Sequence, residues 1–276
     1  MKYNRILTIQ DISCLGQCSM TVALPILSAC GQETCIIPSA VLSTHTGGFQ
    51  RPHIRDISMD IPAIATHWQR ENVAFDAIYT GYLGTQKQIA DVAKVFDTML
   101  RPGGKIIVDP AMADHGKLYS GFDMEYAKAM GELCRKADVI LPNLTESCLL
   151  TGCEYLENYD ESYIAHVLAK LHGMGMKTVV LTGVSYRPAE TGVVLSDGKK
   201  QWYYRHQKLS RSYHGTGDIY ASAFVGSWLG GKTMEEAIQI AADYACECIK
   251  ATIVDESHWY GTKFEAALPH LIDALR

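Results

Sequence analysis

The stretch SYHGTGDIYASAFVG, from Ser212 to Gly226, changes character half-way along. Its first half is small and glycine-rich, and its second half is apolar at helical spacing. Gly215 and Gly217 allow consecutive backbone N–H groups to point into one concavity, and a helix starting near Asp218 adds its positive end. The stretch therefore predicts an anion-binding helix N-terminus with a carboxylate beside it.

Asp218 has two interpretations in this setting. It could accept a proton from an attacking hydroxyl group, late in the transfer of a phosphoryl group whose charge the N–H groups of this concavity stabilise. The alternative is a plain helix N-cap, because aspartate is common at that position. The stretch alone leaves both interpretations open.

Short β-branched runs alternate with longer amphipathic runs over the first two thirds of the chain. Strands are expected at Arg5–Gln10, Thr34–Pro38, Phe75–Thr80, Lys105–Asp109, Asp138–Pro142 and Thr178–Thr182. Helices are expected between them at Ser19–Cys30, Asp60–Glu71, Lys87–Leu100, Glu125–Lys136 and Glu161–Met174. Most strands are apolar on both faces, so we predict an α/β fold with a mostly parallel central sheet and helices on both faces.

The last third of the chain follows a different pattern. Residues Thr191–His206 read as a hairpin that turns at Asp197–Gly198, near one edge of the sheet. The tail is helical, with segments expected at Ile219–Leu229, Met234–Ala251 and Phe264–Leu275. No linker or repeat interrupts the pattern, so a single domain over residues 1–276 is predicted.

Composition excludes several classes of protein. With 276 residues, 47% of them hydrophobic and 20% charged, the chain can bury a large core without disulfides. The net charge of -5 and the lack of a basic run argue against nucleic acid as a partner. The longest apolar stretch contains Pro25 and is too short to span a membrane. The N-terminus does not read as a signal peptide, and the nine cysteines lack zinc-ligand spacing, so a reduced, cytoplasmic protein is expected.

One phosphate-loop match is rejected. Gly226–Thr233, GSWLGGKT, fits the pattern G-x-x-x-x-G-K-T, but a helix precedes it and Trp228 occupies the loop. The better interpretation is a turn between two helices, in which Gly230 and Gly231 end the first. Thr233 would then cap the second helix, with Glu236 completing a capping box.

Polar residues follow most of the predicted strands. In a parallel sheet, ligands gather beyond the carboxyl ends of the strands, so these residues are candidates for a binding site. They are Asp11, Ser13, Ser43, His45, Thr46, Tyr82, Asp109, Asp114, Asn143, Glu146, Thr182 and Gly183. Several have a structural alternative: Asn143 could cap a helix, Asp109 could end a strand, and His45 could be a hydrogen-bonded loop residue.

Five short motifs occur in the order of a known family. They are LSTHTG (Leu42–Gly47), TGYLG (Thr80–Gly84), VDPAMAD (Val108–Asp114), PNLTE (Pro142–Glu146) and GTGD (Gly215–Asp218). In this set the chain resembles the ribokinase-like superfamily, and most closely its pyridoxal kinase branch, over nearly the whole length. The resemblance implies a three-layer kinase fold and ATP-dependent phosphorylation of the 5′-hydroxymethyl group of pyridoxal, pyridoxamine or pyridoxine.

The same resemblance implies a role for each candidate. Asp218 would be the base, and Gly215, Thr216 and Gly217 the anion hole. The substrate would be bound by Asp11, Ser13, Ser43, His45, Thr46 and Tyr82. ATP and its phosphates would meet Asp109, Asp114, Asn143, Glu146, Thr182 and Gly183, with Mg²⁺ held near Asp114 and Glu146. The family pattern also implies a homodimer, and it leaves a monovalent-cation requirement open.

Departures from the pattern keep other functions open. Most pyridoxal kinases end their first strand in Q-S-H, whereas this chain has QDIS, which places Asp11 where the serine should be. That acid is similar to the G-S-D-P start of hydroxymethylpyrimidine kinases, so the same chemistry on hydroxymethylpyrimidine is an alternative. Leu42 and Leu141 also replace a family phenylalanine and threonine. A third possibility is a non-catalytic protein that binds a vitamer or a nucleotide, which would not need a base at Asp218.

Overall fold

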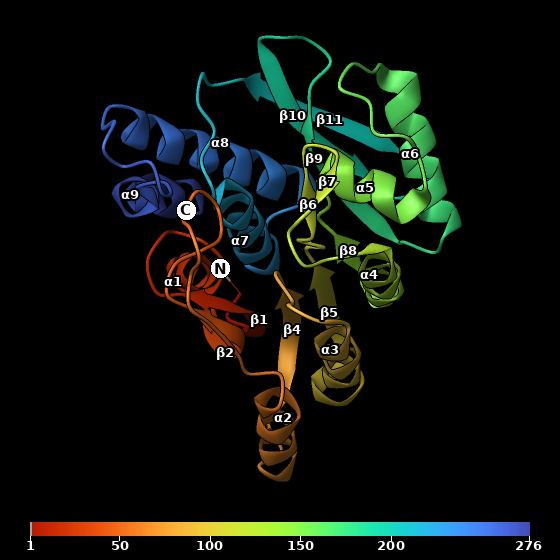
Figure 1. The fold of residues 1–276 in the computed structure, drawn as a ribbon, viewed down its shortest axis with the longest axis vertical. Coiled ribbons are helices and arrows are strands. Elements are labelled where there is room, and N and C mark those ends of the chain that lie inside the picture. Colours follow the sequence, from red (N-terminus) through yellow and green to blue (C-terminus); the bar gives the residue numbers. More distant parts are fainter. Residues whose placement is uncertain (1) are drawn as a thin grey trace.

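A computed structural model describes residues 2–276 of the chain, and nine of the strands in this range form one sheet (Figure 1). Their order is β11-β10-β9-β8-β5-β4-β1-β2-β3, and all neighbours from β9 to β2 are parallel. The strands are β1 (Arg5–Ser13), β2 (Glu33–Leu42), β3 (Ile54–Asp56), β4 (Phe75–Thr80), β5 (Leu100–Val108), β8 (Val139–Ile140), β9 (Thr178–Val184), β10 (Glu190–Ser196) and β11 (Gln201–Gln207). The expected hairpin, β10–β11, lies at one edge, so this part of the prediction is confirmed.

Helices cover both faces of the sheet. One face carries α1 (Met20–Ala29), α7 (Thr216–Leu229), α8 (Met234–Ile253) and α9 (Phe264–Ala274). The other face carries α2 (Asp60–Arg70), α3 (Gln86–Met99), α4 (Met124–Lys136), α5 (Leu144–Thr151) and α6 (Glu161–Gly173). The predicted three-layer α/β architecture is therefore confirmed (Figure 1).

Alternation along the strands divides the buried side chains between two cores. In β1, Ile6 packs with the core under α1 and α7, while Leu7 packs with the core under α2 to α6. In β4, Tyr79 and Ile78 divide in the same way. This division follows from the two-residue period of a strand, and it explains why these runs are apolar throughout.

The α7–α8 junction is the turn expected from GSWLGGKT. Gly230 ends α7, Gly231 adopts a φ of 112°, and Thr233 caps α8. The Thr233 hydroxyl accepts from the Glu236 N–H at 3.2 Å, and the Glu236 carboxylate accepts from the Thr233 N–H at 2.8 Å. Gly226 lies inside α7, where a Cβ would come within 2.6 Å of Cys30, so no phosphate-binding loop forms here.

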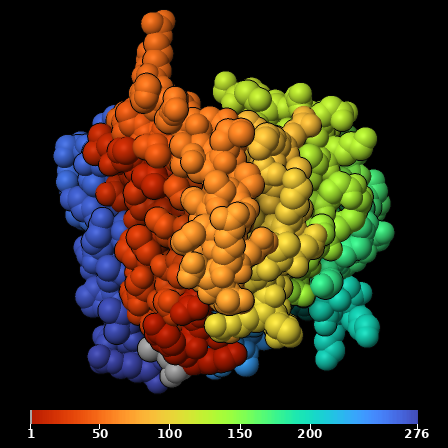
Figure 2. All heavy atoms as spheres, turned by 90° about the horizontal axis from the view of Figure 1, so that it is seen from below, coloured from red at the N-terminus to blue at the C-terminus, as the bar shows by residue number. Residues whose placement is uncertain are grey.

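Short elements escaped the sequence prediction. β3 is a three-residue edge strand antiparallel to β2, and β6 (Ala113–Asp114) pairs with β7 (Lys117–Leu118) in a separate ribbon. Between β2 and β3, the chain around residue 50, orange in Figure 2, projects beyond the neighbouring surface. Of the helices in residues 2–276, none combines the length and apolar character required to cross a membrane.

Candidate functional site

The N-terminus of α7 requires glycine at its cap. Gly215 has a φ of 81°, in the left-handed region, and a Cβ there would lie 1.8 Å from the carbonyl oxygen of Gln17. The Thr216 hydroxyl donates to the Tyr213 carbonyl at 2.8 Å, which fixes the first turn. The backbone N–H groups of this turn have no partner within the helix and carry its positive end, as an anion hole requires.

Asp218 is the third residue of α7, not its cap. Its Oδ2 accepts a hydrogen bond of 2.9 Å from the backbone N–H of Ser19, immediately before α1. The alternative of a plain N-cap is therefore wrong. Burial and the negative charge of Asp11 raise the pKa of Asp218 to about 6, although the Ser19 hydrogen bond lowers it. A carboxylate with that pKa is ionised at neutral pH and can accept a proton.

A cavity of about 410 Å³ opens beside this turn. It brings together all ten residues predicted for the anion hole, base and phosphates: Asp109, Asp114, Asn143, Glu146, Thr182, Gly183, Gly215, Thr216, Gly217 and Asp218. The other lining residues include an apolar group from β10 and α8, namely Val193, Ala242, Ala245 and Ile249. The cavity thus offers a polar end for phosphates and an apolar end for a flat, weakly polar group.

Asn143 and Glu146 form the capping box of α5. Asn143 Oδ1 accepts from the Glu146 N–H at 2.9 Å, and Glu146 Oε2 accepts from the Asn143 N–H at 2.8 Å. Glu146 Oε1 also accepts from the Met112 N–H at 3.1 Å, and the Asn143 amide donates to the Ala113 carbonyl at 2.8 Å. The structural alternative for Asn143 is thus present, and both side chains still line the cavity.

Three carboxylates lie close enough to perturb one another. Burial, followed by the charges of Glu146 and Asp218, raises the pKa of Asp109 well above its ordinary value. Burial also raises the pKa of Glu146 to about 8, against three backbone hydrogen bonds that lower it. Among residues 2–276, no lysine or arginine lines this cavity, so these carboxyl groups have no fixed counterion when they are ionised.

The donor set fits a magnesium ion that is bound mainly through phosphates and water. No group of three His, Cys, Asp or Glu side chains within residues 2–276 forms a ready-made metal cage. Mg²⁺ commonly takes one or two carboxylates and completes its shell with water and substrate phosphates. Glu146 and the exposed Asp114 are available at the cavity wall, and Asp109 is a third carboxylate of the lining.

The residues expected to bind the substrate are absent from the cavity lining, although Asp11 lies near Asp218 and His45 lies near His214. Asp11 is buried within β1, two residues before the strand ends, and its Oδ2 accepts from the Ser13 hydroxyl at 3.0 Å. Burial raises the pKa of Asp11, whereas hydrogen bonds from Ser19 and Ser13 lower it.

His45 is hydrogen-bonded on both ring nitrogens. Nδ1 accepts from the Gly47 N–H at 3.0 Å, so Nε2 carries the proton and donates to the Tyr260 carbonyl at 2.7 Å. Burial lowers its pKa, which keeps the ring neutral. Its ring lies 5.5 Å, centroid to centroid, from that of His214, which is a lining residue of the cavity.

The remaining three candidates occupy two loops. Tyr82 is half-buried, stacks on Phe122 at 5.5 Å, and has its pKa raised by burial and by the charge of Asp11. The Ser43 hydroxyl accepts from the His53 N–H at 2.9 Å and so closes the β2–β3 loop, while Thr46 is exposed on that loop. The structure thus places Asp11 near both Tyr82 and His45, whereas the Ser43 hydroxyl is hydrogen-bonded to the backbone of its own loop.

Some cavity residues were not anticipated. Tyr213 and His214 line the cavity directly before the glycine turn, and their position beside that motif was the available signal. Cys246 and His206 also line it, and the Cys246 sulfur lies 3.2 Å from His206 Nδ1. No sequence signal connects these two, because one comes from a hairpin strand and the other from α8.

A family profile matches most of the chain. The profile described as phosphomethylpyrimidine kinase covers residues 26–262. The chain belongs to this family. Within the ribokinase-like superfamily it falls in the pyridoxal kinase branch, as the motifs predicted. Its membership of this kinase family makes it a phosphotransferase.

Relatives of this kinase family carry two kinds of name. The chain is 27% identical over 272 residues to a pyridoxine/pyridoxal/pyridoxamine kinase of Bordetella avium, covering 91% of this chain and 86% of that protein. It is 27% identical over 221 residues to a hydroxymethylpyrimidine/phosphomethylpyrimidine kinase of Bacillus subtilis, covering 78% of each. A crystal structure of a candidate phosphomethylpyrimidine kinase from Bacteroides thetaiotaomicron, with pyridoxal, superposes with a TM-score of 0.92 at 34% identity, covering 98% and 96% of the two chains.

Proposed function

We propose that this kinase transfers the γ-phosphoryl group of ATP to the 5′-hydroxymethyl group of pyridoxal, pyridoxamine or pyridoxine. The observation that supports it best is the juxtaposition at the start of α7, where a carboxylate stands beside a ready anion hole. Binding alone needs no such base, which disfavours a non-catalytic protein. The names of the relatives and the pyridoxal in the Bacteroides structure support the choice of acceptor.

Asp218 takes the proton of the attacking hydroxyl group. An alcohol is far too weak an acid to be ionised beforehand, so this transfer comes late, when bonding to the loose phosphoryl group is developing. The N–H groups of Gly215, Thr216 and Gly217 stabilise the charge on the transferring oxygens. The apolar end of the cavity, between β10 and α8, suits the adenine ring.

Mg²⁺ fits beside Glu146 and Asp114, where it would neutralise phosphate charge that no lysine or arginine of the described cavity lining offsets. Asp109 adds a third carboxylate. Thr182 and Gly183, near the end of β9, would also contact the phosphates. The part played by this chain is to hold the phosphate chain and its metal in line with Asp218.

On the acceptor side, Asp11 is proposed to meet the pyridine nitrogen. An ionised aspartate can only accept a hydrogen bond, so it favours the protonated ring. Ser13 would orient that carboxylate, and Tyr82 and His45 would line the ring, with Thr46 and Ser43 on the β2–β3 loop. This arrangement rests on the placement of Asp11 near Tyr82, His45 and Asp218.

Hydroxymethylpyrimidine is the alternative acceptor, because several relatives carry the name of a kinase for it and Asp11 is similar to the acid of that branch. The deciding experiment measures ATP turnover with pyridoxal, pyridoxamine, pyridoxine and hydroxymethylpyrimidine under one set of conditions. We expect a kcat/KM for the best vitamer that exceeds the value for hydroxymethylpyrimidine. The reverse order would assign the chain to thiamine synthesis.

Three expectations accompany the proposal. Residues 1–276 would act as one domain, two copies would assemble as a homodimer, and the protein would work in the cytoplasm. Sedimentation of the purified protein at several concentrations tests the second expectation.

A further inference from the structure

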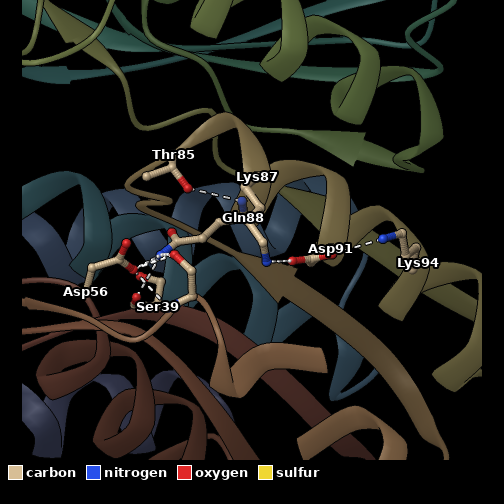
Figure 3. A network of polar contacts seen from close by, with 8 residues as sticks. Ser39, Asp56, Thr85, Lys87, Gln88, Asp91 and Lys94 are labelled. Atoms are coloured by element: carbon tan, nitrogen blue, oxygen red, sulfur yellow. Dashed lines mark hydrogen bonds and ion pairs between the residues drawn. The ribbon is translucent and has the colours of Figure 1, made fainter. Parts of the chain in front are cut away.

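A buried glutamine connects three segments of the chain at the start of α3. Gln88 is 1% exposed, and its amide nitrogen lies within hydrogen-bond distance of the Ser39 carbonyl at 2.8 Å, Ser58 Oγ at 2.9 Å and Asp56 Oδ1 at 3.0 Å, among which it shares two N–H donors. Its amide oxygen accepts from the Gly84 N–H at 2.6 Å. Figure 3 shows the contacts with Ser39 and Asp56 converging on the Gln88 amide.

The segment that carries Tyr82 is held on both sides by this cluster. The Gly84 N–H is bound by Gln88, and the Tyr82 carbonyl accepts from the Ser39 hydroxyl at 3.0 Å. Ser39 stands where the β1–β2 register shifts, since Gln10 pairs with Pro38 but Ile12 pairs with Val41. The irregularity turns Ser39 toward the loop after β4, as bulges beside functional sites often do.

The second segment held by Gln88 is the end of β3 opposite the β2–β3 loop, where Asp56 pairs with Ala40. Asp56 is the last residue of β3, and its carboxylate also accepts from the N–H of Ser58 at 2.8 Å and from the Ser58 hydroxyl. The loop between β2 and β3 carries Ser43, His45 and Thr46. One amide therefore holds the Tyr82 loop directly and, through Ser39 and Asp56, the β2–β3 hairpin whose loop carries the other acceptor-binding candidates.

We propose that Gln88 is a positioning residue for the acceptor site, acting through the backbone of the Tyr82 loop and through the β2–β3 hairpin. The proposal rests on the proposed function, because that function assigns those loops to the acceptor. An amide is needed here, since one end must accept from Gly84 and the other must donate to Ser39. A glutamate would place a buried carboxylate against the negative charge of Asp56.

The chain offers a matched control on the same helix. Asp91 is 6% exposed and accepts from Lys87 Nζ at 2.7 Å and from Lys94 Nζ at 3.0 Å (Figure 3). It lies on α3 next to Gln88 in the helical register, yet its hydrogen bonds in residues 2–276 reach neither loop. Asp91→Asn therefore weakens the helix without releasing the loops, whereas Gln88→Met keeps side-chain length and removes every loop contact.

The test compares steady-state kinetics of both variants with the acceptor that the wild type turns over. For Gln88→Met we expect kcat/KM for that acceptor to fall by about tenfold to a hundredfold, with ATP affinity within about twofold. Asp91→Asn should lose about as much thermal stability as Gln88→Met, yet its kcat/KM for the acceptor and its ATP affinity should stay near the wild-type values. Equal effects of the two variants, or a parallel loss of ATP affinity, would overturn the positioning role.

A second readout does not depend on catalysis. Amide hydrogen exchange should accelerate in residues 81–85 and in the β2–β3 loop of Gln88→Met, and it should stay at wild-type rates there in Asp91→Asn. Should Gln88→Met fail to fold, Ser39→Ala removes only the donor to the Tyr82 carbonyl and should give a smaller change of the same kind. Unchanged exchange rates in these segments would contradict the positioning role, whichever acceptor the wild type uses. If the wild type phosphorylates none of the acceptors tested, that result would instead contradict the proposed function.

Discussion

Asp218 owes its place to a residue 199 positions earlier, since its carboxylate is held by the N–H of Ser19. Asp218→Asn keeps an oxygen that can accept this hydrogen bond but cannot take a proton. We expect kcat to fall by about 10²–10⁴, the usual value of a positioned base. Thermal unfolding should be nearly unchanged. Wild-type turnover by a well-folded variant would show that Asp218 is not the base.

The pKa of Asp218 also sets a pH dependence. Because burial and the charge of Asp11 raise it to about 6, the base is protonated, and therefore inactive, below that pH. We expect kcat/KM of the wild type to fall about tenfold per pH unit on the acid side of about 6. Rates measured between about pH 5 and 8 check this. A profile that stays flat down to the acid end of that range contradicts the assignment.

Asp11 is predicted to accept a hydrogen bond from the protonated nitrogen of the acceptor ring and so to favour the charged ring. A charge-assisted hydrogen bond shielded from water contributes about 1.5–3 kcal/mol. Asp11→Ser should therefore weaken the binding of pyridoxine or pyridoxamine by about tenfold to a hundredfold and change its pH dependence. ATP affinity should be little altered. Affinity titrations from about pH 5.5 to 9 provide the measurement, and superimposable profiles for the two proteins would remove Asp11 from the ring site.

The first turn of α7 is an element whose shape depends on one glycine. Gly215→Ala would force an ordinary residue into a φ of 81° and push its Cβ against Gln17, which precedes the Cys18–Ser19 link to Asp218. We expect a lower melting temperature and a loss of activity. Gly217→Ala is the control for stability, because no atom lies within 4 Å of its added Cβ. Equal melting temperatures for both variants would show that the turn adapts.

Elements with a strong local pattern were predictable, and those that depend on pairing were not. β1 and α8 followed from apolar runs and from the Thr233 capping box. β3 has three exposed residues and exists because β2 offers it an edge, so its own sequence carries no strand signal. Thr34–Pro38 was too short a prediction for β2, because Pro38 reads as a stop yet lies in a parallel ladder that continues to Leu42.

In the candidate site, too, residues with a local sequence pattern were predictable and those that depend on tertiary packing were not. GTGD and PNLTE predicted residues that do line the cavity, because these residues lie at helix starts that their own sequence specifies. The helix was expected to start near Asp218, whereas α7 starts at Thr216, since Gly215 takes the cap. The contacts of Gln88 and the Cys246–His206 pair depend on tertiary packing, which no local pattern reveals.

The molecule as a whole carries an uncompensated acidic cavity. Asp109 has a folded-state pKa well above its ordinary value, so the folded state binds its proton more tightly than the unfolded chain does. The stability that this proton provides is present at low pH and is lost as the pH rises from the ordinary pKa of an aspartate to the raised pKa of Asp109. Asp109→Asn should therefore raise the melting temperature of the ligand-free protein at about pH 8.

Thermal melts of wild type and Asp109→Asn at about pH 5 and about pH 8 make the comparison. The difference should shrink at the lower pH, where the wild-type carboxyl is closer to its neutral form. Added Mg²⁺ should also reduce it at the higher pH, because it gains a third carboxylate in the wild type and therefore stabilises the wild type more than the variant. A variant less stable than wild type at the higher pH would mean that another group of the protein compensates the charge of Asp109.

A ribosome releases Ser19 long before it has made Asp218. At ordinary rates of translation the 199 positions between them take about 10–40 s, and during this time β1 and α1 exist without α7 and its Asp218. No shorter stretch of the chain holds a weak version of the site. Nascent chains and messages cut short before α7 should thus give silent proteins rather than slow ones, and activity should appear in one late step of synthesis.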